Sequence, residues 1–419
     1  MVTTRLTAHG TPVPDRWKSL LFVLFLSVAI SLLASMAAGY SLIWHLTITT
    51  SNTVILALGM GMYSIPGALL GPFIGPLIDR YDRKILLVAS EVFLSAASLI
   101  STLVVIFGQA SVPFVFTLLV IRGIGQAFQG PSFQAMVPLI VPEEHLGRVN
   151  GLSQTIIGGG AIISPPLGVL LYTIFGLQAT LIFHATGAAL AAVILMFARL
   201  PGIHLSIEQR TGVISEFLEG ARSVRAVRGL GLLFLFVMFG ILIFQPVNAL
   251  WPLLVHEHFG GGGFEVSLSE IFFGSGFLIG SIILGIWGGG RHLIRLVLLS
   301  CISQGLIVFA ISQLPSSAFL WFLPPAVFLG LVWPFMQGPL NATVQKRIEP
   351  LKLGRVMALL NSLINFATPL GMIVVTLAGE GVKSQTWYLV CGLALTALAL
   401  CAFIPPSIRG LDKYDPRSM

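Results

Sequence analysis

Long apolar runs constrain this chain more than any other feature of its sequence. Twelve of them lie near residues 18–44, 53–74, 85–107, 114–137, 149–175, 178–198, 229–254, 266–288, 293–312, 319–342, 355–379 and 386–405. A helix needs about 20 apolar residues to cross the hydrocarbon of a bilayer. Strands of a membrane barrel would alternate apolar and polar side chains, and runs such as LLFVLFLSVAISLLASMAAG do not. The sequence therefore predicts an all-α polytopic membrane protein with twelve transmembrane helices.

Charge supports this prediction and gives an orientation. Only 9% of the residues are charged, against about 25% in a soluble domain, which excludes soluble enzymes and DNA-binding modules. Of the 23 basic residues, 21 fall on the side that holds the N-terminus. Positive loops stay in the cytoplasm, so we expect both termini there. The net charge of +7 is a topology signal, and no nucleic-acid partner is expected.

Two smaller features complete this outline. The first 16 residues lack the short apolar core and small-residue cleavage site of a signal peptide, so no cleavage is expected. The three cysteines all lie within apolar runs, and neither a disulfide framework nor a metal site is expected from them.

The chain divides into two halves that repeat one another. We expect a six-helix bundle at 1–198, a cytoplasmic linker at 199–228 and a second bundle at 229–419. Gln129-Gly130-Pro131 recurs as Gln337-Gly338-Pro339, 208 positions later, and Leu146-Gly147-Arg148-Val149 recurs as Leu353-Gly354-Arg355-Val356. Repeated halves place a substrate site between them near the bilayer midplane. The linker has apolar residues at helical spacing, which fits either an amphipathic surface helix or a solvated segment.

The loop after the second run has small residues followed by charges. It reads Gly71-Pro-Phe-Ile-Gly75-Pro-Leu-Ile-Asp79-Arg80-Tyr-Asp82-Arg83-Lys84. Glycines spaced four apart allow close helix contact, and Asp79 can face a helix N-terminus or pair with Arg83. Gly75, Asp79, Arg80, Arg83 and Lys84 are candidates for a cytoplasmic gate. The alternative is a charged loop that only maintains topology.

Few titratable residues lie inside the apolar runs. Arg122 shares a helical face with Gln126 and Gln129, and an arginine in a span costs about 2.5–3.5 kcal/mol on insertion scales. A polar interior is therefore the favoured setting, and a snorkelling side chain is the alternative. Glu91, Glu270 and His184 are the other titratable candidates inside the apolar runs. A site that takes up and releases protons needs a titratable group of this kind. Glu91 and Glu270 could equally be interfacial residues that reach water.

These motifs make the chain resemble the major facilitator superfamily along its whole length. The 71–84 loop is similar to the family's cytoplasmic motif G-x-x-x-D-R-x-x-R-K, and Arg122 to its span-four arginine. Gly151, Gly160, Ser164, Pro165 and Gly168 fit the spacing of its antiporter motif, with Ser164 in place of a glycine. The second-half loop Gly285–Arg291 lacks the acid, and the first span lacks the acid that several proton antiporters have.

The resemblance implies two pseudo-symmetric six-helix bundles around a cavity lined by spans one, four, seven and ten. Trp333 is the one tryptophan in mid-span, which makes it a candidate for stacking on a ligand, with core packing as the alternative. On those spans the cavity candidates are Ser31, Ser35, Gln126, Gln129, Gln245, Asn248, Trp333, Gln337 and Asn341. This set has many amides and little fixed charge, which suits a bulky amphipathic ligand.

The chain looks most similar to the bacterial drug-efflux branch that includes macrolide exporters. That resemblance implies a proton-coupled antiporter in the plasma membrane of a bacterium. It would export hydrophobic or amphipathic small molecules, with Arg122, Glu270 and Glu91 as proton-coupling candidates. We expect a monomer that uses a proton gradient, holds no cofactor and catalyses no covalent chemistry. The alternatives are a dedicated siderophore or metabolite exporter, a lysophospholipid transporter and an uptake symporter, the last disfavoured by the antiporter spacing.

Overall fold

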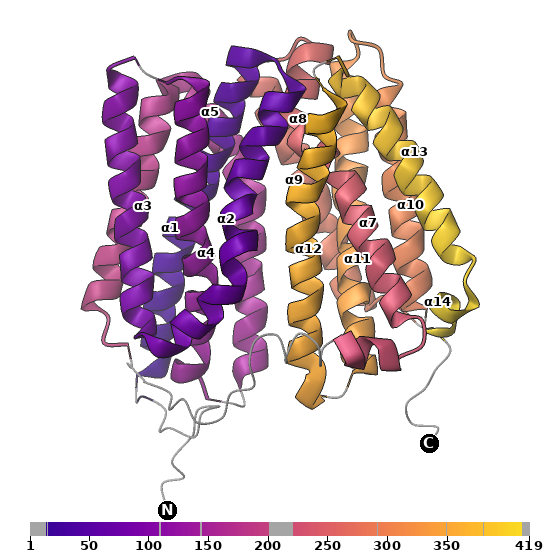
Figure 1. Ribbon diagram of the computed structural model, residues 1–419, viewed down its shortest axis with the longest axis horizontal. Coiled ribbons are helices and arrows are strands. Elements are labelled where there is room, and N and C mark those ends of the chain that lie inside the picture. The colour runs from indigo at the N-terminus through magenta and orange to yellow at the C-terminus, as the bar shows by residue number, and fades with distance from the viewer. Residues whose placement is uncertain are drawn as a thin grey trace, which may run out of the picture. The chain divides into compact units, whose positions relative to one another are not determined.

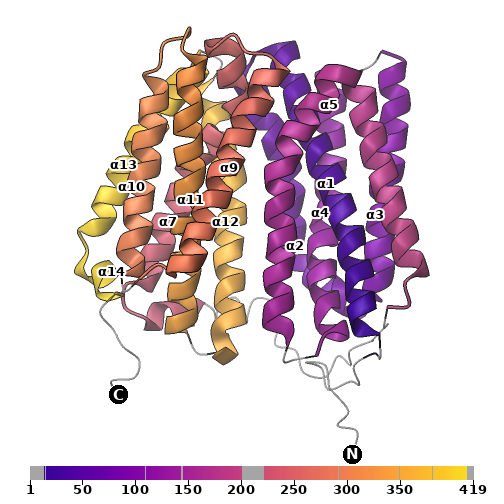
Figure 2. The same ribbon diagram turned by 180° about the vertical axis from the view of Figure 1, so that it is seen from behind.

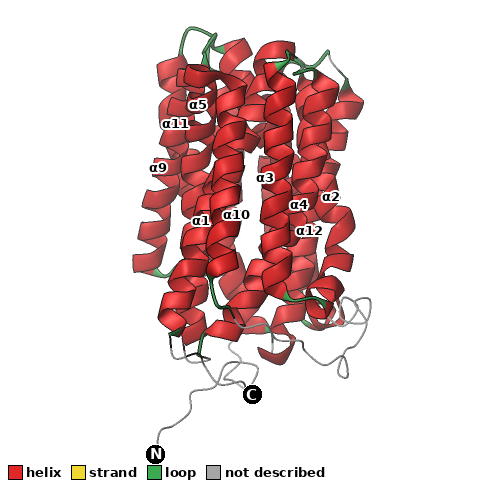
Figure 3. Ribbon diagram, turned by 90° about the vertical axis from the view of Figure 1, so that its left-hand side faces the viewer, coloured by secondary structure: helices red, strands yellow, loops and turns green. Residues whose placement is uncertain are grey.

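The computed structural model describes residues 14, 16–108, 110–142, 145–200, 221–290, 292–348, 350–379 and 381–412. In this part of the chain the regular elements are helices, joined by short loops (Figure 3). The chain separates into two compact units. One comprises Met1–Leu46 and Met62–Gln209, and the other comprises Thr47–Gly61 and Arg210–Met419. Each unit is described by itself below.

The helices up to residue 197 are long and mostly apolar. They are α1 (Trp17–Thr50), α2 (Thr53–Arg80), α3 (Arg83–Ile106), α4 (Val112–Ile140) and α5 (Leu146–Phe197). Within the first unit, α3 lies beside both α4 and α5 (Figure 1). Asp82 caps the N-terminus of α3, because its side chain accepts hydrogen bonds from the backbone N–H groups of Lys84 and Ile85.

The second unit is built in the same way. Its main helices are α7 (Leu230–Ala249), α9 (Gly263–Trp287), α10 (Leu293–Ser312), α11 (Phe319–Arg347), α12 (Pro350–Ala378) and α13 (Ser384–Phe403). Short elements α8 (Trp251–Leu253) and the π-helix η3 (Leu254–His258) continue α7, and α14 (Pro406–Gly410) lies at the end of α13 (Figure 2). Asp412 then caps α10 by accepting hydrogen bonds from the N–H groups of Ile294 (2.8 Å) and Arg295 (3.2 Å).

The predicted twelve spans agree with these helices. Ten segments of the described chain are long and apolar enough to cross a membrane, and Ser362–Ala378 in α12 is a shorter apolar helix. One of the ten, Thr155–Phe197, has 43 residues, which at 1.5 Å per residue is about twice the hydrocarbon thickness. Gly176 breaks it with a φ of 80°, a left-handed conformation that favours glycine. Counting its two parts separately gives eleven, and adding Ser362–Ala378 gives twelve, which confirms the predicted fold class.

Glycines bring helices together at matching places in the two units. A Cβ atom on Gly123 of α4 would overlap the backbone carbonyl of Tyr63 in α2, and one on Gly330 of α11 would overlap that of Phe273 in α9. Gly123 and Gly330 are 207 positions apart, which is the offset between the repeated segments that begin at Leu146 and Leu353. Because lipid is as apolar as the helices, close approach through small residues is what stabilises such pairs. The sequence repeat therefore corresponds to a repeated packing contact.

The predicted linker at 199–228 is described only at its two ends. Residues 201–220 lie outside the described residues, so the predicted amphipathic helix stays a prediction there. Residues 221–226 are helical, and Val224 is buried in the core cluster of the second unit.

Candidate functional site

A fully buried carboxyl group lies inside the first unit. Glu91, on α3, has an exposed fraction of 0%. Ser31 of α1 donates a hydrogen bond to its Oε2 at 2.7 Å, and Gln129 of α4 donates to its Oε1. The Gln129 amide also donates to the Ser31 hydroxyl at 2.8 Å. Three helices thus meet at this carboxyl.

No cation of the described residues lies beside Glu91. Among the described residues, no lysine, arginine or histidine forms an ion pair with this side chain, and its partners are a hydroxyl and an amide. A buried carboxylate without a counter-ion loses its hydration and gains little in return. Within the described residues, this carboxyl therefore has two neutral donors and no balancing charge. The Ser31 hydroxyl can accept as well as donate, so it can also receive a hydrogen bond from the carboxyl when that group is protonated.

A buried guanidinium lies farther along the contact between α1 and α4. Arg122 is 1% exposed, and its Nη2 donates to the backbone carbonyl of Ser35 and to the Ser35 hydroxyl at 3.2 Å. Gln126 donates to the same hydroxyl at 2.8 Å. Ser31 and Ser35 are four residues apart on α1, so about one helical turn separates the carboxyl and guanidinium levels.

An imidazole from the second part of α5 provides a further hydrogen-bond acceptor for the guanidinium. Nη1 of Arg122 lies 2.8 Å from Nδ1 of His184, which is fully buried. A guanidinium can only donate, so Nδ1 accepts and the neutral ring carries its proton on Nε2. Ser98 of α3 places its hydroxyl 2.6 Å from the same Nδ1. In the described part of the chain, Nε of Arg122 and Nε2 of His184 have no hydrogen-bond partner.

The antiporter-motif residues of α5 pack against α1. Gly160, Ser164 and Gly168 are four residues apart and form one helical face. A Cβ atom on Gly160 would lie 3.2 Å from Leu32, and Ser164 donates to the carbonyl of Leu33 at 3.4 Å. Pro165 is buried, and Gly151 lies near the start of α5, where its surroundings are outside the described part. This face holds α5 beside the helix that carries Ser31 and Ser35.

Two residues of the predicted gate, Arg83 and Lys84, donate hydrogen bonds to backbone carbonyls near the ends of α4 and α5. Arg83 is buried and donates from Nη1 to the carbonyl of Ala135 at 2.7 Å. Lys84 donates from Nζ to the carbonyls of Met196 at 3.0 Å and Ala198 at 2.8 Å, where α5 ends. A lysine at a helix C-terminus satisfies carbonyls that lack helical partners. The side chains of Asp79 and Arg80, and the surroundings of Gly75, lie outside the described residues.

In the second unit the predicted polar residues are more dispersed. Gln245 of α7 donates to Oγ1 of Thr368 on α12 at 2.5 Å. Asn248 is exposed, and Gln337 and Asn341 on α11 are half-buried. Glu270 on α9 is half-buried, and no hydrogen bond or ion pair joins it to a described residue. A cavity role for these residues, and proton coupling by Glu270, stay predictions.

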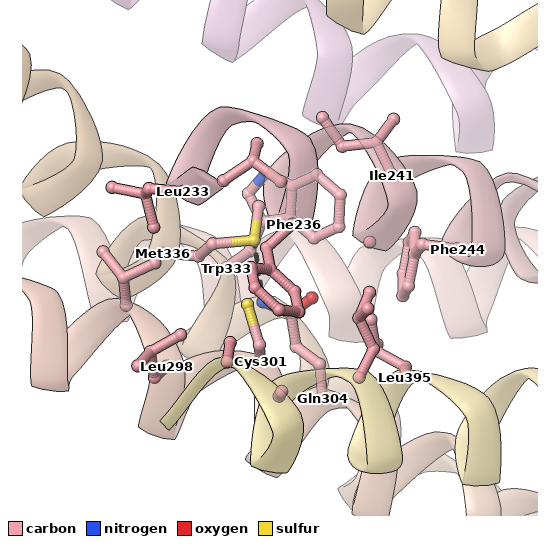
Figure 4. A pocket seen from close by; sticks show the side chains of 16 residues that line it. Leu233, Phe236, Ile241, Phe244, Leu298, Cys301, Gln304, Trp333, Met336 and Leu395 are labelled. Atoms are coloured by element: carbon pink, nitrogen blue, oxygen red, sulfur yellow. Dashed lines mark hydrogen bonds between the residues drawn. The ribbon is translucent and has the colours of Figure 1, made fainter. Parts of the chain in front are cut away.

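Trp333 borders a narrow apolar pocket between α7, α10, α11 and α13. Its ring packs against Phe244 with centroids 4.9 Å apart. Cys301 and Gln304 of α10 also line the space (Figure 4). Gln304 is 2% exposed, and its amide donates a hydrogen bond to Sδ of Met336 at 3.9 Å. The pocket lies wholly in the second unit and offers an aromatic face with few polar groups.

Sequence reasoning identified Glu91, Arg122 and His184 as titratable but did not join them. Ser98, which contacts His184, was missed because a serine in an apolar run gives no signal of its own. The spacing of Ser31 and Ser35, equal to one helical turn, was the available indication that α1 presents two hydroxyls to one neighbour.

Comparisons with known proteins agree with this architecture. The sequence model described as "Major Facilitator Superfamily" matches residues 21–372. Macrolide efflux protein A of Streptococcus pyogenes is 32% identical over 399 residues, covering 95% of this chain and 98% of that protein. Multidrug efflux pump Tap of Mycobacterium bovis is 24% identical and covers 81% of this chain and 82% of that one.

Solved structures share the fold. The nucleoside transporter NupG superposes with a TM-score of 0.66 at 14% identity, covering 96% of this chain and 100% of that one. A bacterial homologue of the iron transporter ferroportin, in an inward-facing state, gives a TM-score of 0.68 at 15% identity, with 93% and 99% covered.

Proposed function

This chain belongs to the major facilitator superfamily, and from that premise we propose that it is a proton-coupled antiporter that exports hydrophobic or amphipathic small molecules, macrolides among them, by alternating access. The observation that carries the export of macrolides is the 32% identity to macrolide efflux protein A, which extends over 95% of this chain. A likeness of this extent includes both halves and the loops between helices.

Proton coupling is supported by the surroundings of Glu91. A coupling group must hold a proton in one state and release it in another, and a buried carboxyl with neutral hydrogen-bond partners can hold one. Arg122 lies about one turn away, and the acceptors that it has among the described residues are neutral. It is the buried cation that can stabilise the carboxylate after the proton leaves.

We place the protein in the plasma membrane of a bacterium, with both termini in the cytoplasm and a monomer as the working unit. The distribution of basic residues supports this orientation, since 21 of 23 lie on the side of the termini. The apolar pocket beside Trp333 supports a ligand that is mostly apolar.

Drug accumulation in cells tests the proposal. A bacterial strain without major efflux pumps, expressing this chain, should accumulate less radiolabelled macrolide than the same strain with an empty vector. A protonophore and the substitution Glu91→Gln should each restore accumulation to the empty-vector level. Glu265→Gln is the matched control, because glutamine keeps the oxygen that accepts the Gly262 N–H at 2.8 Å.

The results can contradict either part of the proposal. Equal accumulation with and without the protein, at confirmed expression, would contradict macrolide export. Efflux that Glu91→Gln leaves intact would contradict proton coupling by this residue. Siderophore and lysophospholipid release, measured in the same strains, would identify those cargoes instead.

A further inference from the structure

Arg122 is held by neutral acceptors, and this is unusual for a buried charge. Its described contacts are the carbonyl and hydroxyl of Ser35 and the imidazole of His184. No described carboxylate contacts it. Buried charges are commonly paired, and the unpaired carboxyl Glu91 lies about one helical turn away along α1. The guanidinium of Arg122 and the carboxyl of Glu91 could pair with each other, but each forms hydrogen bonds with other side chains.

We infer that His184 is the residue that holds Arg122 away from Glu91 while the carboxyl carries its proton, and that Ser98 takes over the imidazole when the guanidinium leaves. His184 is then a positioning residue. The inference rests on the proposed function, because it requires Glu91 to exchange protons.

Hydrogen-bond accounting supports the first state. When Glu91 is protonated, it has no negative charge that attracts the guanidinium. The buried guanidinium then requires neutral hydrogen-bond acceptors for its N–H groups. Nδ1 of His184 supplies one at 2.8 Å, and only a neutral ring with its proton on Nε2 can do so. A protonated imidazole would donate at both nitrogens and would repel the guanidinium. His184 thus acts as an acceptor that adds no charge.

The second state is accounted for in the same way. When Glu91 loses its proton, the guanidinium gains a charged partner and moves by about one helical turn, about 5 Å. This leaves Nδ1 of His184 without Arg122. The Ser98 hydroxyl already lies 2.6 Å from that nitrogen and can donate to it without movement of α3. Neither state leaves the imidazole Nδ1 unsatisfied.

The surrounding groups are consistent with such an exchange. In the described part of the chain, the titratable groups near this cluster are Arg122 on α4, Tyr63 on α2, which interacts electrostatically with Arg122, and Glu91 on α3. Helix α1 contributes the hydroxyls of Ser31 and Ser35, while its His45 bonds to Tyr172. Arg122 is the charged group that interacts with His184.

The test is the pH dependence of macrolide transport in proteoliposomes, measured at a constant pH difference across the membrane. His184→Leu removes the acceptor and destabilises the protonated state, so the midpoint should move to lower pH by about one unit, which is a tenfold change in proton affinity. Ser98→Ala destabilises the other state, so its midpoint should move to higher pH. His184→Asn keeps a neutral acceptor and should retain the wild-type midpoint.

A purely structural role predicts lower rates without opposite shifts. Midpoints of His184→Leu and Ser98→Ala that equal the wild type, or move in the same direction, would overturn the inference. If His184→Leu does not fold, Ser98→Ala decides alone, because it keeps the histidine, and an unshifted midpoint would overturn the inference. If His184→Leu and Ser98→Ala both keep the wild-type midpoint while the Glu91→Gln protein has lost its pH dependence, only the role of His184 is refuted. Wild-type transport that is independent of pH would refute the coupling proposal and this inference together.

Discussion

Gly168 of α5 lies so close to Ala37 of α1 that a Cβ atom on the glycine would overlap the alanine carbonyl oxygen. The Ser41 hydroxyl, one turn along α1, donates to the Gly168 carbonyl at 2.8 Å. Close backbone contact and a hydrogen bond across it are the two means by which helices associate in lipid. This contact fixes α1, and with it the two serines that bind Glu91 and Arg122.

Gly168→Ala should therefore destabilise the first unit. The new methyl group would meet backbone atoms that cannot rotate away, and overpacking of this kind costs about 1–3 kcal/mol. Thermal unfolding in detergent, followed by fluorescence-detected gel filtration, should show a lower Tm. Gly158→Ala is the matched control, since it lies on the same helix with nothing within 4 Å of its Cβ position. Equal Tm values for the two variants would contradict the contact.

Lys84→Met should loosen the end of α5 at Phe197. The substitution keeps the length of the side chain and removes the hydrogen bonds from Nζ to the carbonyls of Met196 and Ala198. Hydrogen bonds from a charged donor are worth about 1.5–3 kcal/mol when protected from water, and less for this half-buried side chain. We expect faster proteolysis at residues 199–228, with protection restored by Lys84→Arg. Unchanged proteolysis would show that the lysine does not fasten this end.

Trp333→Ala should weaken macrolide binding without shifting the pH midpoint of transport. An aromatic contact contributes about 0.5–1.5 kcal/mol beyond its buried area, so the KM should rise about 2- to 12-fold. The matched control is Trp321→Ala, since that indole is 73% exposed at the start of α11. A Trp333→Ala protein with the wild-type KM would leave Trp333 as a packing residue of the second unit.

Cysteine labelling should establish the orientation in the membrane. With the native cysteines replaced by serine, Lys383→Cys should react with a membrane-impermeant maleimide on intact cells. Arg199→Cys should react only after permeabilisation, because the positive-inside rule puts its loop in the cytoplasm. Labelling of Arg199→Cys on intact cells would invert the proposed topology.

The spans could be predicted from the sequence because each apolar run must cross the bilayer by itself. The predicted break between 175 and 178 coincides with Gly176, whose φ of 80° ends one helix and starts the next. A glycine at the junction of two apolar runs is a local signal, and it was sufficient to predict where one span ends and the next begins. The surroundings of Asp79 and the linker residues 201–220 lie outside the described residues, so those predictions stand as they were made.

The polar network could be predicted only in part. The spacing of Arg122, Gln126 and Gln129 placed them on one face of a helix, and all three donate to α1 or α3 in the structure. Their partners could not be identified, because the rotation of α1 and of the second part of α5 about their own axes decides which side chains face α4. Those rotations depend on glycine contacts such as that of Gly168, which involve residues far apart in the chain.

Proton release on ligand binding tests the central claim most directly. Addition of a macrolide to the purified transporter in weakly buffered detergent solution should acidify the medium, as a pH indicator dye would show. The reason is that the proposed proton exchange requires Glu91 to give up its proton. The Glu91→Gln protein should bind the macrolide without acidification. Proton release of equal size from the two proteins would contradict the account.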